Sequence, residues 1–550
     1  MEFESLNDLD YYRKKALSID EWRDTRLPFF EEVDTYLCPN RAIFSGNDTK
    51  GQRSDTEILT SVARLNVRTL VAGLMSGNTP QSFKWFNLVA NQRDLMEDPA
   101  AKAWLYDETQ AQFDTLAATN FYRAMAFHYL DASVFKCGLT LVEMSYTKTT
   151  TYTPIEPGTY TLGYDSDGNV NQVARDVEYT IAQMVEKFGL DNLSDGLREQ
   201  YKSPINHNTK VQVTHYVGPN KNANPGSLRS EEKEWVSLWW EKGKASETTN
   251  AKFLRRAGYD LFPFLVTEWE DCPAFIAMPD ILQLYRMISD KLLALEKELD
   301  PPLTGPAALL DENPSATPGS FIPDKGDGSA EKGVRPVYQI RFDLNAVSAE
   351  IEKVEAILRQ AFFTNTLMML SSLKDRQRTA TEVIELKQEL LMQFGPVTDS
   401  FNRMQDHNSD LVFSHRMKLG FVAPVPPSLD NAEFGPDYNS AMTQAQKMSG
   451  LGNVERIFNL AATMAQMNFD ISKFNPDAMF DIYSEKLNAP PELIRSDEQA
   501  AAVRQAATQA QNEVAAAQSA RLQAQTLKDL GTTPTDENSI LERMAGAAAQ

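Results

Sequence analysis

Two stretches in the second half of the chain carry apolar residues at helical spacing. In Ile281–Leu299 the apolar positions follow one another in alternate steps of four and three, and Val347–Met369 repeats the pattern. Such spacing places apolar side chains on one side of a helix, so we predict two helices, each with one packing stripe. The predicted stripe residues are Ile281, Tyr285, Ile288, Leu292 and Leu295 in the first helix, and Val347, Ile351, Val354 and Leu358 in the second.

The segment between these helices, residues 300–345, cannot continue a helix. It contains seven prolines and several glycines, and proline removes a backbone donor and clashes with the preceding turn. One interpretation is an ordinary antiparallel helical hairpin with a long surface loop. The other is a functional insert, because irregular segments of this length are uncommon in compact domains unless they bind something.

A basic segment follows the second helix. Lys374, Arg376 and Arg378 place three cations within five residues of a net-acidic chain. In a single chain this is consistent with an exposed linker whose charges are solvated. In a ring of copies the same residues would form a circle of positive charge.

The residue patterns in the rest of the chain predict a mixed α+β fold that is mainly α. Residues 1–135 have helical patterns, including Thr56–Leu74 and Ala101–Thr119. Residues 139–175 and 207–270 instead have alternating apolar and polar positions with many β-branched residues, which is typical of strands. The acidic stretch 165–169 contains Asp-Gly, which favours a hairpin turn over a calcium loop. We also predict a long helix over Thr379–Leu419, kinked at Gly395 and Pro396.

The last predicted helix covers Asp497–Leu530, which is rich in Ala and Gln. Alanine and glutamine favour the helix intrinsically. The few large apolar residues of this stretch cannot form a core alone, so we expect it to need neighbours.

Composition and charge restrict the possible functions. The 550-residue chain has 76 acidic and 54 basic residues, a formal net charge of −22, which disfavours general adhesion to DNA. There is no run of 18 apolar residues and no signal-peptide pattern at the start. We therefore expect a soluble protein of several domains that is made in a cytosol and has no membrane partner.

The residue patterns of common catalytic and metal sites are missing from the sequence. There is no phosphate-binding Gly-x4-Gly-Lys motif, no nucleophile elbow and no His-Glu-x-x-His pair. His128 with Asp131, and His407 with Asp406 and Asp410, have helical spacing, but no further ligands lie near them in sequence. We expect no catalytic residues, no metal and no cofactor.

Short motifs spread in order over nearly the whole chain give a resemblance to a known family. They comprise Gly73, Gly77, Thr79 and Pro80; Trp85, Phe86 and Leu88; Asp165, Asp167, Gly168, Val170, Val173 and Arg175; Asp300 to Leu303; Pro318 and Gly319; Thr379 to Val383; Gly395 and Pro396; and Pro490 to Arg495. This ordered set resembles the portal proteins, or head-to-tail connectors, of short-tailed bacteriophages of the podovirus type. The stretch Thr267 to Trp269 departs from the family, in which an Arg-Trp pair and a Tyr-Gly segment are common.

The resemblance implies a portal fold assembled as a ring. Residues 1–279 would form the wing, 280–299 and 346–369 the two stem helices, and 300–345 the clip. The tunnel loop would occupy 370–381, a kinked wing helix and linker 382–434, and the helical crown or barrel 435–550.

The resemblance also implies a structural function and a set of partners. The ring, typically a dodecamer, would form the channel at one capsid vertex through which double-stranded DNA is packaged and ejected, without sequence preference. The clip, including Pro301, Pro302, Pro318 and Gly319, would dock the large terminase subunit and the tail adaptor, and other surfaces would contact the major capsid or scaffolding protein. The ring would belong to the virion and assemble in the host bacterial cytoplasm.

Charge is consistent with this implied function. Twelve copies would carry a formal charge of about −264, twelve times −22, and such a wall would repel DNA instead of holding it. Lys374, Arg376 and Arg378 would then face the DNA from the tunnel loop. The alternatives are a metal-dependent DNA-processing enzyme with dispersed carboxylate ligands and a non-viral helical scaffold protein.

Overall fold

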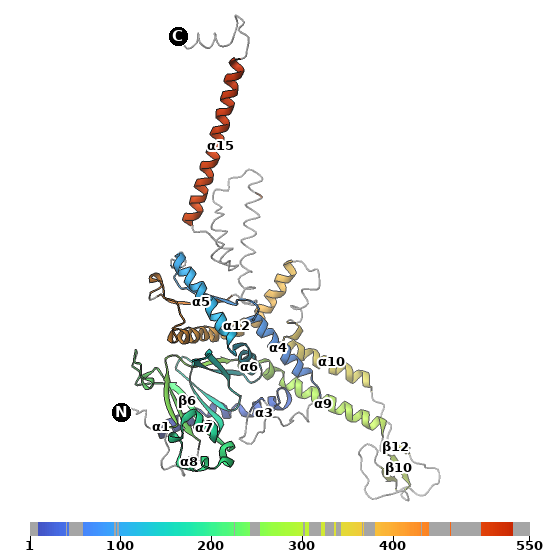
Figure 1. Cartoon of the computed structure of the whole chain (residues 1–550). Helices are drawn as coiled ribbons and strands as arrows, with labels where there is room; N and C mark the ends of the chain where they lie inside the picture. The colour runs from blue at the N-terminus through green and yellow to red at the C-terminus, as the bar shows by residue number, and fades with distance from the viewer. Residues whose placement is uncertain are drawn as a thin grey trace.

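The computed structural model describes residues 9–42, 59–92, 98–242, 253–300, 343–367, 380–438 and 497–531, apart from a few positions within these ranges, together with three short strands between residues 303 and 336 and two isolated residues. Figure 1 shows a main body of helices and sheets from which the paired helices α9 (Pro273–Leu299) and α10 (Leu344–Ala361) extend to one side. The prediction of a mixed fold of helix and sheet is confirmed.

The N-terminal part is mainly helical, as predicted. Its helices are α1 (Leu9–Ser18), α2 (Glu21–Asp24), α3 (Leu27–Tyr36), α4 (Val62–Asn78), α5 (Pro99–Ala118) and α6 (Phe121–Val134). Helix α5 begins two residues before the predicted start at Ala101, because the Asp98 side chain accepts a hydrogen bond from the Ala100 amide and Pro99 occupies the first turn. Helix α4 extends beyond the predicted end at Leu74, and the first residues predicted for it lie outside the described part of the chain.

One strand in this helical region was missed by the sequence analysis. Strand β1 (Phe86–Ala90) pairs antiparallel with β13 (Phe434–Tyr438), in a register that places Phe86 opposite Tyr438. The two strands are far apart in the sequence but adjacent in space. This pairing therefore brings the segment after α12 (Ala380–Lys418) back onto the N-terminal helices.

The β-rich part contains the strands expected from residues 139–175 and 207–270. A five-stranded antiparallel sheet has the order β4-β5-β6-β7-β8, and a three-stranded sheet has the order β3-β2-β9. The strands are β2 (Cys137–Ser145), β3 (Thr149–Pro154), β4 (Tyr160–Tyr164), β5 (Val170–Thr180), β6 (Lys210–Pro219), β7 (Trp235–Glu241), β8 (Arg255–Tyr259) and β9 (Phe264–Glu268), with helices α7 (Ile181–Phe188) and α8 (Asp195–Tyr201) between β5 and β6.

The predicted hairpin turn joins β4 to β5. The Asp165 side chain accepts hydrogen bonds from the amides of Asp167 and Asn169, at 2.9 and 2.8 Å. Gly168 has φ +83°, a conformation that glycine adopts without strain. These bonds to the backbone lower the pKa of Asp165, and the turn prediction is confirmed.

The two faces of the five-stranded sheet are covered by different elements. Helix α1 packs on one face, where Tyr12 meets Tyr216. On the other face, Val173 and Val217 pack against the three-stranded sheet, and Trp239 packs against α7. A separate, larger core unites α4, α5 and α6 with α9, α10 and α12.

The paired helices differ in length from their predictions. Helix α9 spans Pro273–Leu299 and so begins eight residues before the predicted start, with Pro279 inside it. Pro279 lies in the second turn, where it lacks the backbone donor that would bond to the Phe275 carbonyl, so it weakens the helix locally. Helix α10 spans Leu344–Ala361 and ends earlier than the predicted Met369, since Phe363 adopts a left-handed conformation with φ +53°.

The remaining helices follow the sequence pattern closely. Helix α12 runs over Ala380–Lys418 and α15 over Asp497–Gly531. Helix α12 contains the predicted kink position at Gly395 and Pro396, and Figure 1 shows its two parts pointing in different directions. The described side chains of α15 between residues 502 and 525 are exposed.

Candidate stem, tip and docking surfaces

The base of α9 is held firmly in the main core. Ile281 is fully buried and Tyr285 almost so. The Tyr285 hydroxyl donates a hydrogen bond to the Thr60 carbonyl at 3.0 Å, and its ring meets that of Tyr36 edge to face with centroids 5.0 Å apart. These contacts fix the direction in which α9 leaves the body.

Helix α10 returns along α9 and enters the same core. Ile351, Val354 and Leu358 are buried there. Ile288 of α9 and Val347 of α10 are partly buried against it. All five are residues of the predicted stripes, and the apolar spacing that predicted the helices therefore coincides with side chains buried near the body.

The far half of the pair leaves apolar side chains uncovered within one chain. Leu292, one of the predicted stripe residues, is 51% exposed, and Leu299 is 84% exposed. Leu293 is also exposed, and Leu295 is half-buried. One polar contact joins the helices here, since the Lys291 ammonium donates to the Ser348 hydroxyl at 3.0 Å. The outer half therefore presents an apolar surface that this chain does not cover.

The outer part of α9 and the whole of α10 are also net acidic. Residues 290–300 contain four carboxylates and two lysines, and residues 343–361 contain four carboxylates, Lys353 and Arg359. The Lys353 and Arg359 side chains pair with glutamates of their own helix. The combination of exposed leucines and excess carboxylates allows contact with other protein surfaces and disfavours tight binding of DNA phosphates.

A small sheet lies beyond the ends of the paired helices. Strand β10 (Leu303–Pro306) pairs parallel with β11 (Phe321–Asp324) and antiparallel with β12 (Arg335–Pro336). Figure 1 places β10 and β12 at the end of the α9–α10 pair, away from the body. The segment predicted to be irregular thus contains a three-stranded sheet, which its prolines concealed because they are uncommon in strands.

Several predicted site residues fall outside the described part of the chain. Among the expected docking residues these are Pro301, Pro302, Pro318 and Gly319. In sequence, the first two directly precede β10 and the last two lie just before β11. The basic residues Lys374, Arg376 and Arg378 lie in the stretch between α10 and α12 and are also outside the described residues.

The end of α12 is anchored by a buried polar network. The Arg416 guanidinium forms a bidentate ion pair with the Glu108 carboxylate of α5. It also donates to the Thr115 hydroxyl and to the Phe421 carbonyl, at 3.1 and 3.0 Å. Next to it, the hydroxyl of Thr150 and the imidazole of His415 lie 3.2 Å apart. These bonds fix α12 to both the helical and the β-rich parts of the body.

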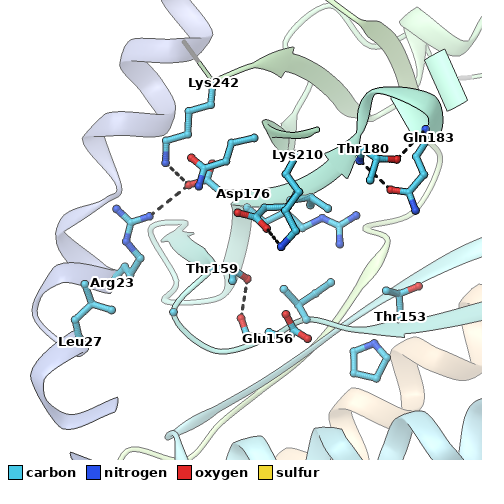
Figure 2. A pocket seen from close by; sticks show the side chains of 17 residues that line it. Arg23, Leu27, Thr153, Glu156, Thr159, Asp176, Thr180, Gln183, Lys210 and Lys242 are labelled. Carbon is cyan, nitrogen blue, oxygen red and sulfur yellow. Dashed lines mark hydrogen bonds and ion pairs between the residues drawn. The ribbon is translucent and has the colours of Figure 1, made fainter. Parts of the chain in front are cut away.

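A cavity of about 680 Å³ is bordered by α2, β5 and the loop between β3 and β4. Figure 2 shows Arg23 and Lys242 converging on Asp176 at its rim. Lys210 reaches the Glu178 carboxylate at 3.1 Å. Charged side chains therefore line the cavity, and most of them pair with one another.

The histidine and aspartate pairs noted in the sequence have structural partners. The His128 ring lies between the hydroxyls of Thr140 and Thr267, 3.0 and 2.9 Å away, and burial lowers its pKa to about 3. Asp131 pairs instead with Arg41; burial raises the pKa of Asp131 to about 6 although Arg41 opposes the shift. Across the residues that the structure describes, no group of three His, Cys, Asp or Glu side chains could hold a metal ion.

Comparison with known proteins identifies the family. Residues 10–494 match the family described as "Bacteriophage head to tail connecting protein". The chain belongs to this family. It is a structural connector and not an enzyme.

Two relatives match the connector almost from end to end. It is 28% identical to a "Probable portal protein" of Bordetella phage BPP-1, over 96% of this chain and 97% of the relative. It is 27% identical to the "Portal protein" of Salmonella phage epsilon15, over 94% of each chain. Proteins of this family are components of the virion. None of the described helices of this connector combines the length and the apolar character needed to span a membrane.

Contacts between residues far apart in the sequence of the connector could not be predicted from local patterns. Arg416 and Glu108 are 308 positions apart, and nothing in their local patterns indicates a pair. Arg175 was recognised as part of a family motif, yet its position on the border of the cavity was not foreseen. The available signal was a charged residue at an inward-facing position of a strand, since Val173 on the same face is apolar.

Proposed function

We propose that the connector assembles into a ring, with twelve copies as in typical portal proteins, whose central channel carries double-stranded DNA into and out of the capsid at one vertex. The observation that supports this best is the α9–α10 pair. It belongs to a chain whose full length matches portal proteins, and its outer half exposes Leu292, Leu293 and Leu299. Neighbouring pairs in a ring would cover these leucines, since exposed apolar patches usually mark interfaces.

We infer the following parts of the subunit from the same arrangement. Residues 1–279 form the wing, 280–299 and 346–369 the stem, 300–345 the clip, 370–381 the tunnel loop, 382–434 a wing helix and linker, and 435–550 the crown or barrel. The stem proposal is supported by the shared core of α9 and α10. The clip proposal is supported by the small sheet at the end of that pair, away from the body.

The position of this sheet makes it the proposed docking surface. A surface at the end of two extended helices is accessible to partners even when the bodies of neighbouring copies are packed together. We propose that it binds the large terminase subunit during packaging and the tail adaptor afterwards, with Pro301, Pro302, Pro318 and Gly319 in the contact. Contact with the major capsid or scaffolding protein is assigned to the wing and crown, and assembly to the host bacterial cytoplasm.

The proposed channel would be net acidic. The chain carries −22, and the outer part of α9 together with the whole of α10 contains twice as many carboxylates as cations. DNA would slide past such a wall because no dense set of cations neutralises its phosphates. Lys374, Arg376 and Arg378 are proposed to make the few sequence-independent phosphate contacts that guide or retain the DNA.

Negative-stain electron microscopy of the purified chain tests the ring. We expect closed rings with a central hole, and native mass spectrometry should give the number of copies. Monomers or dimers at micromolar concentration and physiological salt would contradict the proposal. Loss of rings in a variant that replaces Leu292, Leu293 and Leu299 by serine would identify the stem as part of the interface.

A further inference from the structure

The cavity of Figure 2 lies beside an uncovered strand edge. Strand β4 pairs with β5 only from Val170 to Arg175, whereas β6 pairs with β5 as far as Thr180. Residues 177–180 of β5 therefore have a strand neighbour on one side only, and on the other side the Thr180 amide donates to the Gln183 side chain, so the open edge comprises residues 177–179. Val177, Glu178 and Thr180 line the cavity on the other side, and natural proteins usually cover such edges.

An incompletely paired arginine lines the same cavity. Arg175 is only 6% exposed, and its Nε donates to the Nδ1 of His215 at 3.1 Å. In the part of the chain that the structure describes, its two terminal nitrogens make no hydrogen bond, and no carboxylate lies within ion-pair distance of it. Glu143 acts on Arg175 electrostatically, but its carboxylate accepts from the Tyr259 hydroxyl instead.

His215 cannot balance the charge of Arg175. Burial, together with the positive charge of Arg175, holds the pKa of His215 well below its ordinary value. The imidazole is therefore neutral, with Nδ1 accepting from Arg175 and Nε2 donating to Ser237, 3.0 Å away. The ring also stacks on Trp239 with centroids 3.8 Å apart, which fixes it in place. Burying an arginine without an anion is costly, and burial lowers the pKa of Arg175.

The other cations on the border of the cavity already have partners. Arg23 and Lys242 pair with Asp176, and Lys210 pairs with Glu178. Arg175 is thus the buried cation of this cavity with unused donors, and its planar guanidinium suits the two oxygens of a carboxylate. A chain with 76 acidic residues offers many such groups to a neighbouring copy.

We propose that this cleft is an assembly site that receives an extended acidic segment of a second copy, which pairs with the open edge of β5 and places one carboxylate on Arg175. The inference rests on the proposed ring. The two observations that support it, the open edge and the unused guanidinium, lie on one strand and border one cavity. A free oxyanion would satisfy Arg175 alone and would leave the strand edge uncovered.

A cross-linking experiment identifies the occupant. Rings of the full-length Arg175→Lys variant would be assembled from equal amounts of unlabelled and ¹⁵N-labelled chains and treated with a carbodiimide, which joins an amine to a carboxylate in contact with it. We expect the substituted lysine to be linked to an acidic peptide, with half of the linked peptides of mixed isotopic mass. Rings that yield only links within one copy, or no link at this position, would overturn the inference while leaving the ring intact.

Stability measurements separate an assembly contact from a merely structural one. Arg175→Gln should leave the melting temperature of the dissociated chain unchanged or raise it, because it removes a buried charge without an anion. The same change should weaken ring association at least about tenfold, since charged hydrogen bonds contribute about 1.5–3 kcal/mol. Lys202→Gln, which removes an exposed cation just after α8, is the control and should change neither quantity.

Other outcomes are equally decisive. Destabilisation of the dissociated chain by Arg175→Gln with unchanged ring association would assign the arginine a role within its own subunit and overturn the inference. Stabilisation of the dissociated wild-type chain by inorganic phosphate, lost in Arg175→Gln, together with unaltered ring association, would show a free oxyanion site instead. Failure of the wild-type chain to form rings would overturn the proposed function and this inference together.

Discussion

Nε and Nη2 of Arg416 lie 3.1 and 3.2 Å from the two carboxylate oxygens of Glu108. Both side chains are buried, and they connect the end of α12 to the middle of α5. The pair joins residues that are 308 positions apart in the sequence, and it anchors the C-terminal end of α12 in the main body. It is therefore the first target for a test of the fold.

Breaking this ion pair should strongly destabilise the subunit. Glu108→Gln leaves the Arg416 charge buried without an anion, and such changes cost about 3–5 kcal/mol. The free energy of unfolding of the dissociated chain, measured with urea, checks the prediction. Asp399→Asn is the matched control on α12, since its pair with Arg403 is exposed and should contribute less than about 1 kcal/mol. Equal losses for the two variants would contradict the assignment.

The two helices of the proposed stem, α9 and α10, should respond differently along their length. Leu358 is fully buried, whereas Leu292 is 51% exposed. Leu358→Ala should lower the free energy of unfolding of the dissociated chain by about 2–5 kcal/mol, because it leaves a cavity in the core. Leu292→Ala should change it by less than about 0.5 kcal/mol. If the exposed leucine proved as costly in the dissociated chain as the buried one, the proposed uncovered half of the stem would be wrong.

The buried His128 should make the subunit sensitive to acid. Its pKa is about 3 in the folded chain and about 6.5 when unfolded, so the unfolded state binds the extra proton between these values. Stability should therefore fall as the pH drops below 6.5, with a contribution of about 3 kcal/mol at pH 4. Urea unfolding of the wild type and of His128→Gln from pH 4 to pH 8 measures it. The free energy of unfolding of the variant should depend less steeply on pH than that of the wild type. Parallel pH dependences would contradict the contribution of His128 to acid sensitivity.

The sequence pattern predicted elements whose formation depends on nearby residues. Helix α15 matches its predicted range to within one residue at its end, because alanine-rich sequence favours helix intrinsically. The Asp165 turn was predicted for a similar reason, since one carboxylate accepts bonds from amides two and four residues along the chain. Such features need no knowledge of the rest of the fold.

Elements that depend on distant contacts were missed or misjudged. Strand β1 forms because β13 pairs with it, and helix α10 ends where Phe362 is fully buried in the core and Phe363 turns out of the helix. At the candidate site, the apolar spacing identified the apolar face of each of the helices α9 and α10, but it did not show that Leu292 would be exposed. A stripe gives one face of a helix, and only the tertiary structure decides how much of that face the same chain covers.

The basic segment provides the sharpest test of the proposed channel. Replacing Lys374, Arg376 and Arg378 together by alanine removes the phosphate contacts proposed for the loop and leaves the stem unchanged. Rings should form normally, while DNA-filled heads, counted by electron microscopy and nuclease protection, should fall several-fold. A control variant with Lys148, Lys202 and Arg229 replaced by alanine has the same net charge but loses cations from exposed surfaces of the β-rich part. If the loop variant gave as many stable, DNA-filled heads as the wild type, the proposed role of the loop would be contradicted. If both variants lost filled heads to the same extent, net charge and not position would control packaging.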